Sequence, residues 1–183
     1  YPCKISTLGR PAKLGLASAY VRGFQWGLAR GFDAIAEMDA DFSHDPIYLP
    51  RMAAALRHHD FVVGSRYTSG GGVKGWQAWR RILSRGGSLY AQTILGLDMG
   101  DLTGGYNLWS RSVLEGIGLD RIRSDGYTFQ IELKYRAICR GFRGVEVPII
   151  FEDRQAGHSK MSRRIVMEAV WRVWHLRLAG RRL

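Results

Sequence analysis

The apolar positions of this sequence recur with helical spacing in several segments. Residues 14–30 carry this pattern and stop at a glycine, which commonly follows the end of a helix. Residues 80–97 and 126–140 show the same spacing. Asp45 followed by Pro46 is typical of a helix start, and the apolar residues after it again fall three or four positions apart. The pattern therefore predicts a helix in each of these places.

Shorter apolar runs lie between the helical segments and predict strands. They occupy residues 33–38, 61–64 and 145–151, and Pro148 places the last run at a sheet edge or a bulge. A glycine-rich loop follows the second run, at residues 67–74. Because strands and helices succeed one another, the sequence predicts an α/β fold with a mostly parallel sheet flanked by helices.

Composition limits the size of the core and the kind of partner. With 183 residues and 46% hydrophobic content, the chain is expected to form a single domain, 1–183. The net charge of +11 favours an anionic partner, whether a phosphorylated substrate, a nucleic acid or an acidic membrane surface. Cys3 and Cys139 lack metal-site spacing and are expected to be free thiols in a reducing compartment. No apolar run reaches the length of a membrane span, so we expect any membrane contact to be peripheral.

A group of carboxylates follows the first predicted strand, in the stretch AEMDADFSHDP at residues 36–46. Ligands of α/β sheets bind beyond the carboxyl ends of strands, so a site is expected here. If the strand continues, Asp39 and Asp41 point to the same side and repel each other unless a cation neutralises them. Carboxylates suit Mg²⁺ or Mn²⁺, and such a metal can bridge a diphosphate. The alternative is that both residues only shape and cap a loop.

Eight stretches that together cover nearly all of the chain carry a resemblance to a known family. They are KLGLASAYVRGF, EMDADFSHDP, VVGSRY, RILSRGGSLYA, DLTGGYNLWSR, SDGYTFQIEL, VEVPIIFEDR and GHSKMS. In this order they resemble the polyprenol-phosphate mannosyltransferases, also called dolichol-phosphate mannose synthases, which are family 2 glycosyltransferases with a GT-A fold. The resemblance implies transfer of mannose from GDP-mannose to the phosphate of a polyprenyl (dolichyl) lipid, with inversion at the anomeric carbon and with Mg²⁺ or Mn²⁺ as cofactor.

The resemblance also implies roles on the donor side. Asp39 and Asp41 match the family's DxD motif, which holds the metal and the diphosphate of the donor. Asp101, in DLTGGY, is expected to contact the sugar, and Gln130, in SDGYTFQIEL, to point into the same site. Ser43 stands where some members carry a glutamine that assists the metal. Since serine is a poor metal ligand, we expect water to fill that position.

On the acceptor side, the resemblance assigns the lipid phosphate to Arg66 in GSRY, to Arg80 and Ser84 on one helix face, and to Arg154 and Lys160 around QAGHS. Arginine suits this role because its guanidinium can bind an anion through two parallel hydrogen bonds. A lipid phosphate is ionised at neutral pH and attacks without a general base. Catalysis then reduces to positioning and charge neutralisation, so Arg66 counts as catalytic together with the two aspartates. The alternative treats these residues as ordinary solvated cations.

Two motifs that usually open the family, a PTYNE-like strand and a DD.S.DGT strand, do not occur in this sequence. The resemblance therefore implies that two βα units, about 60 residues, are missing ahead of Tyr1, and that the chain is an N-terminally truncated, partial catalytic domain whose activity on its own is uncertain. One alternative is an inactive truncated paralogue. Another is a polyprenyl-phosphate glucosyltransferase or a further member of family 2. A nucleic-acid-binding module is not expected, because many of the aromatic residues fall in helix or strand patterns instead of lining a basic face.

The last segment, residues 161–183, predicts a basic amphipathic helix. The helix either packs on the core or lies on an anionic membrane surface, with its tryptophans at the acyl boundary. We expect the second arrangement, on the cytosolic face of the membrane, because a polyprenyl phosphate resides in the bilayer. The predicted apolar stripe comprises Met167, Val170, Trp171, Trp174 and Leu178.

Overall fold

Strands and helices alternate along the chain as the apolar pattern predicts. The computed structural model describes residues 5–12, 14–153 and 163–180, with the side chains of the last helix described from residue 170 onward. The helices are α1 (Leu16–Ala29), α2 (Leu49–Leu56), α3 (Ala78–Leu95), α4 (Arg111–Gly116), α5 (Gly126–Cys139) and α6 (Arg163–Ala179), with 3₁₀ turns at Pro46–Tyr48 and Leu119–Arg121. The strands are β1 (Ala34–Glu37), β2 (Phe61–Ser65), β3 (Gly72–Lys74), β4 (Asn107–Ser110), β5 (Gly144–Pro148) and β6 (Ile150–Glu152).

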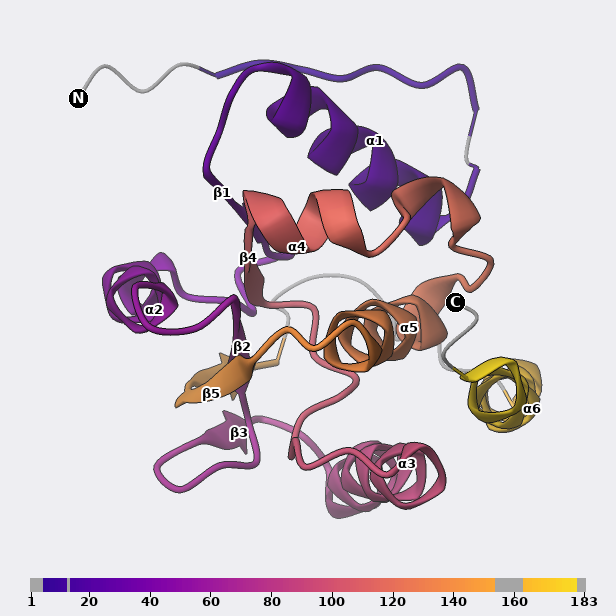
Figure 1. Cartoon of the computed structure of the whole chain (residues 1–183). Coiled ribbons are helices and arrows are strands. Elements are labelled where there is room, and N and C mark those ends of the chain that lie inside the picture. The colour runs from indigo at the N-terminus through magenta and orange to yellow at the C-terminus, as the bar shows by residue number, and fades with distance from the viewer. Residues whose placement is uncertain (1–4, 13, 154–162, 181–183) are drawn as a thin grey trace.

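Four strands form the central sheet, in the order β1-β4-β2-β5 (Figure 1). β4 runs antiparallel to both of its neighbours, whereas β5 pairs with β2 in parallel. β1, β2 and β5 thus point the same way, and their carboxyl ends share one edge of the sheet. A second, two-stranded sheet pairs β3 with β6 in parallel. This arrangement confirms the α/β fold with a sheet flanked by helices.

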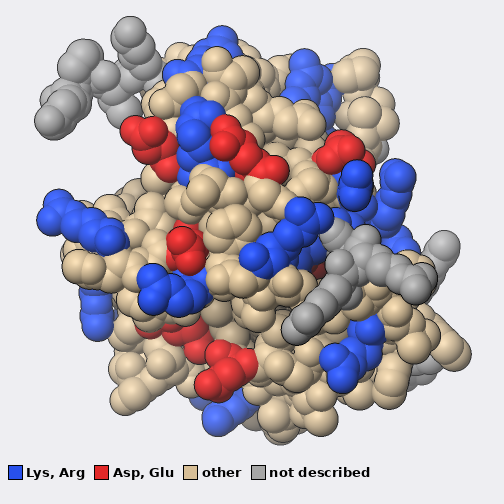
Figure 2. Space-filling model, in the orientation of Figure 1, with Lys and Arg blue, Asp and Glu red and all other residues tan. Residues whose placement is uncertain are grey.

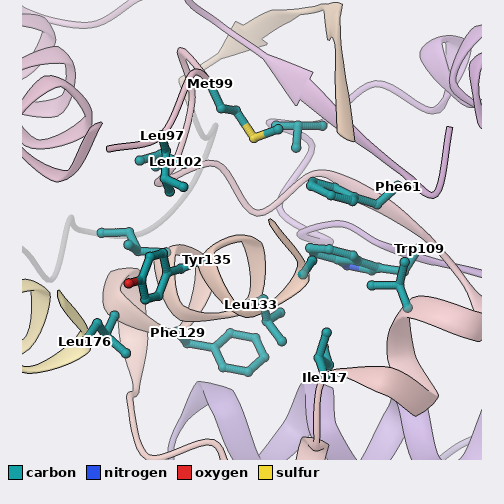
Figure 3. Packing of buried hydrophobic residues seen from close by; sticks show 14 of the residues in the cluster. Phe61, Leu97, Met99, Leu102, Trp109, Ile117, Phe129, Leu133, Tyr135 and Leu176 are labelled. Atoms are coloured by element: carbon teal, nitrogen blue, oxygen red, sulfur yellow. The ribbon is translucent and has the colours of Figure 1, made fainter. Parts of the chain in front are cut away.

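Each face of the sheet packs against its own helices, because side chains alternate along β2 and β4. Val62 and Leu108 lie on one face, in a cluster with Met52 of α2. Phe61 and Trp109 lie on the other face, stacked with 5.1 Å between ring centroids (Figure 3). Their cluster includes buried side chains from α1, α3, α4, α5 and α6. α2 therefore covers one face, and the remaining helices contribute to the core of the other (Figure 1).

Some details differ from the predicted pattern. The run at residues 145–151 divides at Pro148, where β5 ends, because proline has no backbone N–H with which to continue the ladder. β4 and α4 were not predicted, since each is too short to show a clear period in the sequence. The predicted cap is confirmed: Asp45 accepts a hydrogen bond from the backbone N–H of Ile47 at 2.9 Å, in front of α2.

α6 packs on the core through residues that lie outside the predicted apolar stripe. Val173 and Leu176 are buried in the large cluster, and α6 lies against α3 and α5. In contrast, Trp171, Trp174 and Leu178 are 72%, 45% and 83% exposed. These three stripe residues therefore present apolar surface to the outside. Within the described ranges, no helix combines the length and the apolar character that crossing a bilayer requires.

Gly144, the first residue of β5, allows a test of how tightly the core packs around β2. A Cβ atom added at Gly144 lies 2.2 Å from Cζ of Phe61 and 2.8 Å from Cε of Met99. We expect Gly144→Ala to lower the free energy of unfolding by about 1–3 kcal/mol, because both neighbours must move within a close-packed core. Urea unfolding followed by circular dichroism measures the change.

Gly86→Ala is the matched control, since Gly86 is exposed on α3 and an added Cβ atom meets nothing within 4 Å. We expect this variant to gain about 0.5–1 kcal/mol, because alanine is favoured over glycine inside a helix. If Gly144→Ala is as stable as Gly86→Ala, the packing around Phe61 is looser than the structure indicates.

Candidate active site

The acidic residues predicted as a metal site lie in a turn directly after β1. The strand ends at Glu37, so strand alternation does not set the directions of Asp39 and Asp41. Local hydrogen bonds set them instead. Asp41 accepts from the backbone N–H and the hydroxyl of Ser43, and Asp39 accepts from the hydroxyl of Tyr20 in α1 at 3.2 Å. Both carboxylates therefore belong to one short turn at the carboxyl edge of the sheet.

This turn concentrates negative charge. Burial raises the pKa of the Tyr20 hydroxyl well above its usual value, and the carboxylates of Asp39, Glu37 and Asp41 raise it further. Hard oxygen ligands of this kind fit Mg²⁺ or Mn²⁺. Among the described residues, no three His, Cys, Asp or Glu side chains are arranged to hold a metal ion. A cation at Asp39 and Asp41 would thus take its other ligands from water or from a bound phosphate.

His44 connects the acidic turn to a set of aromatic side chains. Its Nδ1 accepts a hydrogen bond from the backbone N–H of Asp39 at 3.0 Å, and burial lowers the pKa of the ring. The imidazole lies 4.9 Å from the ring of Tyr106 and 5.3 Å from that of Phe151. Phe151 in turn lies 5.7 Å from the guanidinium carbon of Arg66. Aromatic rings therefore join the acidic turn to the cationic side of the site.

Arg66, directly after β2, is buried in an ion pair with Asp101. Its Nε and one terminal nitrogen donate to the two carboxylate oxygens at 2.7 and 2.6 Å, and its backbone N–H donates to the same carboxylate at 3.0 Å. The two side chains are 7% and 0% exposed. Burial alone would raise the pKa of Asp101, but the charge and hydrogen bonds of Arg66 outweigh it and hold that pKa below its usual value. The pair is therefore ionised and shielded from solvent.

Arg80 and Ser84 lie on one face of α3, as their spacing predicts. The guanidinium carbon of Arg80 lies 4.4 Å from the ring centroid of Trp76, and Arg80 also pairs with Asp153 at 2.9 Å. Ser84 accepts a hydrogen bond from the hydroxyl of Tyr67 at 2.7 Å. The guanidinium of Arg66 lies near both of these rings as well. The structure thus brings Arg66, Arg80 and Ser84, which were predicted to bind the acceptor phosphate, together around two aromatic rings.

The two residues predicted for the sugar lie in a buried layer beneath the site. Gln130, which is 3% exposed, accepts a hydrogen bond from Asn107 at 3.0 Å. Asp101 is occupied by its ion pair and by the backbone N–H of Gly104. Both residues therefore support the loop between α3 and β4. Two further predicted residues lie outside the described part of the chain: Arg154 and Lys160.

Sequence reasoning missed the side chains that fix this loop. Glu146 in β5 accepts hydrogen bonds from the backbone N–H groups of Gly100 and Asp101, both at 2.8 Å. Lys134 in α5 is fully buried and donates to the carbonyl of Gly104 at 2.8 Å. Glu146 lies in the matching stretch VEVPIIFEDR, but no role was predicted for it or for Lys134. The available signal is a charged residue among apolar neighbours, in VEVPII and in IELKYRAI.

A buried carboxylate lies beneath the acidic turn. Glu37 accepts hydrogen bonds from the amide of Asn107 and from the indole of Trp109, and burial raises its pKa to about 7. Burial also lowers the pKa of Lys134, to about 8. Asn107 donates to Gln130 too, so one amide connects β1, β4 and α5. This polar layer joins the acidic turn to the loop that carries Asp101.

Comparison with known proteins agrees with this geometry. Residues 1–118 match the family described as "Glycosyl transferase family 2". The chain is 47% identical over 177 residues to the "Undecaprenyl-phosphate mannosyltransferase" of Micrococcus luteus, an alignment that covers 97% of this chain and 73% of that protein. It is 44% identical over 182 residues to the "Polyprenol monophosphomannose synthase" of Mycolicibacterium smegmatis, which covers 98% and 68% of the two chains.

Solved structures confirm the predicted GT-A fold. Glucosyl-3-phosphoglycerate synthase from Mycobacterium tuberculosis, in complex with phosphoglyceric acid, superposes with a TM-score of 0.60 at 17% sequence identity. The match covers 94% of this chain and 56% of that one, so the chain spans little more than half of the solved structure. The same enzyme in complex with Mn²⁺, UDP-glucose and glycerol 3-phosphate gives a TM-score of 0.57. At this level of identity the likeness concerns the fold.

The buried ion pair can be tested by removing one charge without changing its shape. We expect Asp101→Asn to lower the free energy of unfolding by about 3–5 kcal/mol, because Arg66 is left as an uncompensated buried charge. Glu152→Gln is the matched control: its partner is Lys74, both side chains are more than half exposed, and the expected cost is below about 1 kcal/mol. Urea unfolding at neutral pH measures both values. Similar values for both variants would contradict a strong contribution from the pair.

The stability difference between the wild type and Asp101→Asn should also depend on pH, in a direction that the pKa of Asp101 sets. Because the folded protein holds the pKa of Asp101 below its usual value of 3.8, the carboxylate contributes its full stability above that value. This contribution is lost as the pH falls through the lowered folded pKa. The stability difference between the wild type and Asp101→Asn should therefore be constant near neutral pH and narrow in acid. A stability difference that widens in acid would contradict the lowered pKa of Asp101 in the folded protein.

Proposed function

The chain belongs to glycosyl transferase family 2, and from this membership we propose that it transfers mannose from GDP-mannose to the phosphate of a polyprenyl lipid, with inversion at the anomeric carbon. The observation that carries the proposal is the identity of 47% and 44%, over nearly the whole chain, to two proteins named for mannosyl transfer to polyprenyl phosphates. The site supports it, because an acidic turn and a cationic cluster lie on two sides of one aromatic group. The two substrates must be held side by side, the sugar diphosphate with its cation at the acidic turn and the lipid phosphate at the cationic cluster.

On the donor side, we assign the acidic turn to a divalent cation and the diphosphate. Asp39 and Asp41 supply hard oxygen ligands, and Tyr20 and Ser43 fix their directions. A bound Mg²⁺ or Mn²⁺ would neutralise the diphosphate that leaves with the nucleotide. The ring of His44 accepts a hydrogen bond from the backbone N–H of Asp39 and so holds it in place. Without this cation, the carboxylates would repel the donor.

On the acceptor side, we assign the lipid phosphate to the cluster around Trp76 and Tyr67. Arg80 is the side chain best placed to bind it. Arg80 is 14% exposed and its partner, Asp153, is 33% exposed, so a phosphate can reach this ion pair from solvent. Arg66 is held by Asp101 and contributes positive charge from a fixed position. Ser84 adds a hydroxyl, and we retain the predicted acceptor roles of two residues outside the described ranges, Arg154 and Lys160.

Since the lipid phosphate is ionised, it can attack the anomeric carbon without losing a proton to the protein. The residues of this chain then have two tasks: to align two anions and to keep water away from them. The loop between α3 and β4 serves the first task, because Glu146, Lys134 and Asp101 fix its backbone from three directions. Asp101 and Gln130 thus act on the sugar side through the shape of this loop.

The outer face of the helices supports a position on the cytosolic membrane surface. Along α3, the helix that carries Arg80, the apolar side chains of Trp79, Ile82 and Leu89 are 57%, 74% and 61% exposed. α6 lies against α3, and its side chains Trp171, Trp174 and Leu178 are exposed. Amphipathic helices of this kind bury their apolar face at the headgroup boundary. We therefore propose that the single domain binds the membrane peripherally, with the acceptor cluster close to the lipid.

The donor assignment predicts metal dependence. We expect Asp41→Asn to lower the rate of mannosyl transfer at least about a hundredfold, because the cation site loses one of its two carboxylates. EDTA should abolish transfer by the intact enzyme, and added Mg²⁺ or Mn²⁺ should restore it. Radiolabelled mannose recovered in the lipid phase measures the rate.

Asp45→Asn is the matched control for this prediction. Asp45 belongs to the same acidic stretch but caps a helix, and asparagine caps equally well. We expect this variant to keep near wild-type activity. Full activity of Asp41→Asn, or transfer that continues in EDTA, would remove the acidic turn from the donor site.

The acceptor assignment predicts a selective loss. Arg80→Ala should weaken use of the polyprenyl phosphate by about 1.5–3 kcal/mol, the contribution of a charge-assisted hydrogen bond, and should leave the KM for GDP-mannose nearly unchanged. Arg81→Ala removes the same charge from the adjacent, exposed position of α3 and should have little effect. Steady-state kinetics with each substrate varied in turn decide the matter. An equal loss for both substrates would show that Arg80 does not serve the acceptor.

A further inference from the structure

A second group of cationic side chains lines a cavity between α5, α6 and the segment that joins α4 to α5. The cavity has a volume of about 380 Å³. Figure 2 shows Lys and Arg side chains gathered on the part of this face where α5 and α6 lie in Figure 1. None of the predicted site residues lines the cavity. Its lining comprises Arg121, Arg123, Ser124, Glu132, Arg136, Arg172, His175 and Leu176.

The cavity has an excess of positive charge. Its one carboxylate, Glu132, is neutralised by Arg136 at 2.7 Å and accepts hydrogen bonds from two backbone N–H groups. Within the described ranges, Arg121, Arg123 and Arg172 take part in no ion pair that would balance them. Arg172 donates one hydrogen bond, to the carbonyl of Arg123. Three guanidinium groups therefore surround one cavity without a matching anion.

Ser124 adds a buried polar group at this cavity. The residue is 4% exposed, it lines the cavity, and its hydroxyl has no hydrogen-bond partner among the described residues. Leaving a buried hydroxyl unpaired costs free energy, so such a group favours a hydrogen-bond partner from outside the described chain. A hydroxyl beside three arginines is suited to a phosphate oxygen, which accepts hydrogen bonds from both kinds of donor.

The surface next to the cavity indicates where this phosphate comes from. Trp171 and Trp174 project from the neighbouring face of α6 and are 72% and 45% exposed. His175 and Arg172 line the cavity from the same helix. Tryptophan favours the headgroup level of a bilayer, where its ring can be partly apolar and partly wet. A cationic cavity beside such rings lies at the depth of lipid phosphates.

We infer that this cavity binds the phosphate of an anionic phospholipid headgroup, at a site separate from the one that serves the reaction. The lipid phosphate accepts hydrogen bonds from Ser124 and from the guanidinium groups of Arg123 and Arg172, while the tryptophans of α6 enter the acyl boundary. This role goes beyond the proposed transfer reaction, because the bound lipid is not consumed. It fixes how the domain is oriented on the bilayer.

Vesicle flotation tests the site with the intact protein and without either substrate. The vesicles contain phosphatidylcholine alone or phosphatidylcholine with phosphatidylglycerol. We expect the wild type to prefer the anionic vesicles, and Arg123→Gln and Arg172→Gln each to weaken this binding roughly fivefold, the effect of one cation near an anionic surface. Ser124→Ala should weaken it too, although no charge is removed.

Arg57→Gln is the matched control, because Arg57 is exposed at the end of α2, across the molecule from α6 (Figure 1). It removes the same charge from the protein and should change vesicle binding less than about twofold. If Arg57→Gln and Arg123→Gln weaken binding equally, the attraction comes from net charge and the site is refuted. The same follows if Ser124→Ala binds as the wild type does.

A titration with inorganic phosphate distinguishes the two sources of the anion. We expect inorganic phosphate at millimolar concentration to leave the nuclear magnetic resonance signal of the Ser124 amide unchanged, because a lipid site needs the bilayer contact as well. A saturable shift with phosphate, together with vesicle binding that does not depend on Arg123, would assign the cavity to a soluble anion and overturn the inference. The vesicles carry no polyprenyl phosphate and flotation measures no transfer, so failure of the transfer proposal would leave this result intact.

Discussion

The buried ion pair between Arg66 and Asp101 is the interaction on which the candidate site depends. It joins the end of β2 to the loop before β4, where solvent does not screen either charge. Such a pair is tolerated only when its remaining hydrogen bonds are satisfied. Here the backbone of Gly104 and the hydroxyl of Thr103 complete it. Removing Asp101 would leave the charge of Arg66 buried without its partner, so the pair holds the loop and the guanidinium in place together.

The site separates two electrostatic environments that a transferase for two anions needs. Carboxylates collect in the turn after β1, and guanidinium groups collect around the aromatic rings beside β2 and α3. The ring of His44 lies between them, and burial lowers its pKa, which disfavours a positive charge there. Arg66 is immobilised, whereas Arg80 is held only by a partly exposed carboxylate. One cation is therefore fixed in advance, and the other can exchange its partner for a ligand.

The sequence predicts those features that arise from local pattern. The apolar period predicted α1, α3 and α5, and Asp45 marked the start of the next helix correctly. The motif predicted that Asp39 and Asp41 lie together after β1, and they do, although hydrogen bonds from Ser43 and Tyr20, and not a strand, set the geometry of that turn. The supports of the loop could not be predicted, since the partners of a buried charge lie far away in sequence. For α6, the sequence offered two arrangements, and the structure shows that Trp171 and Trp174 are exposed while Val173 and Leu176, which lie outside the predicted stripe, pack on the core.

The strand order of the sheet has a consequence for how the protein is made. In the described part of the chain, every strand pairs with a strand that is distant in sequence: β1 with β4, β2 with β4 and β5, and β3 with β6. Pairings of this kind close long loops and fold slowly. During synthesis, β2 must wait until Gly144–Pro148 has left the ribosome before its parallel partner exists. The nascent chain therefore presents apolar strand edges for an extended time, and it is in this interval that chaperones would be needed.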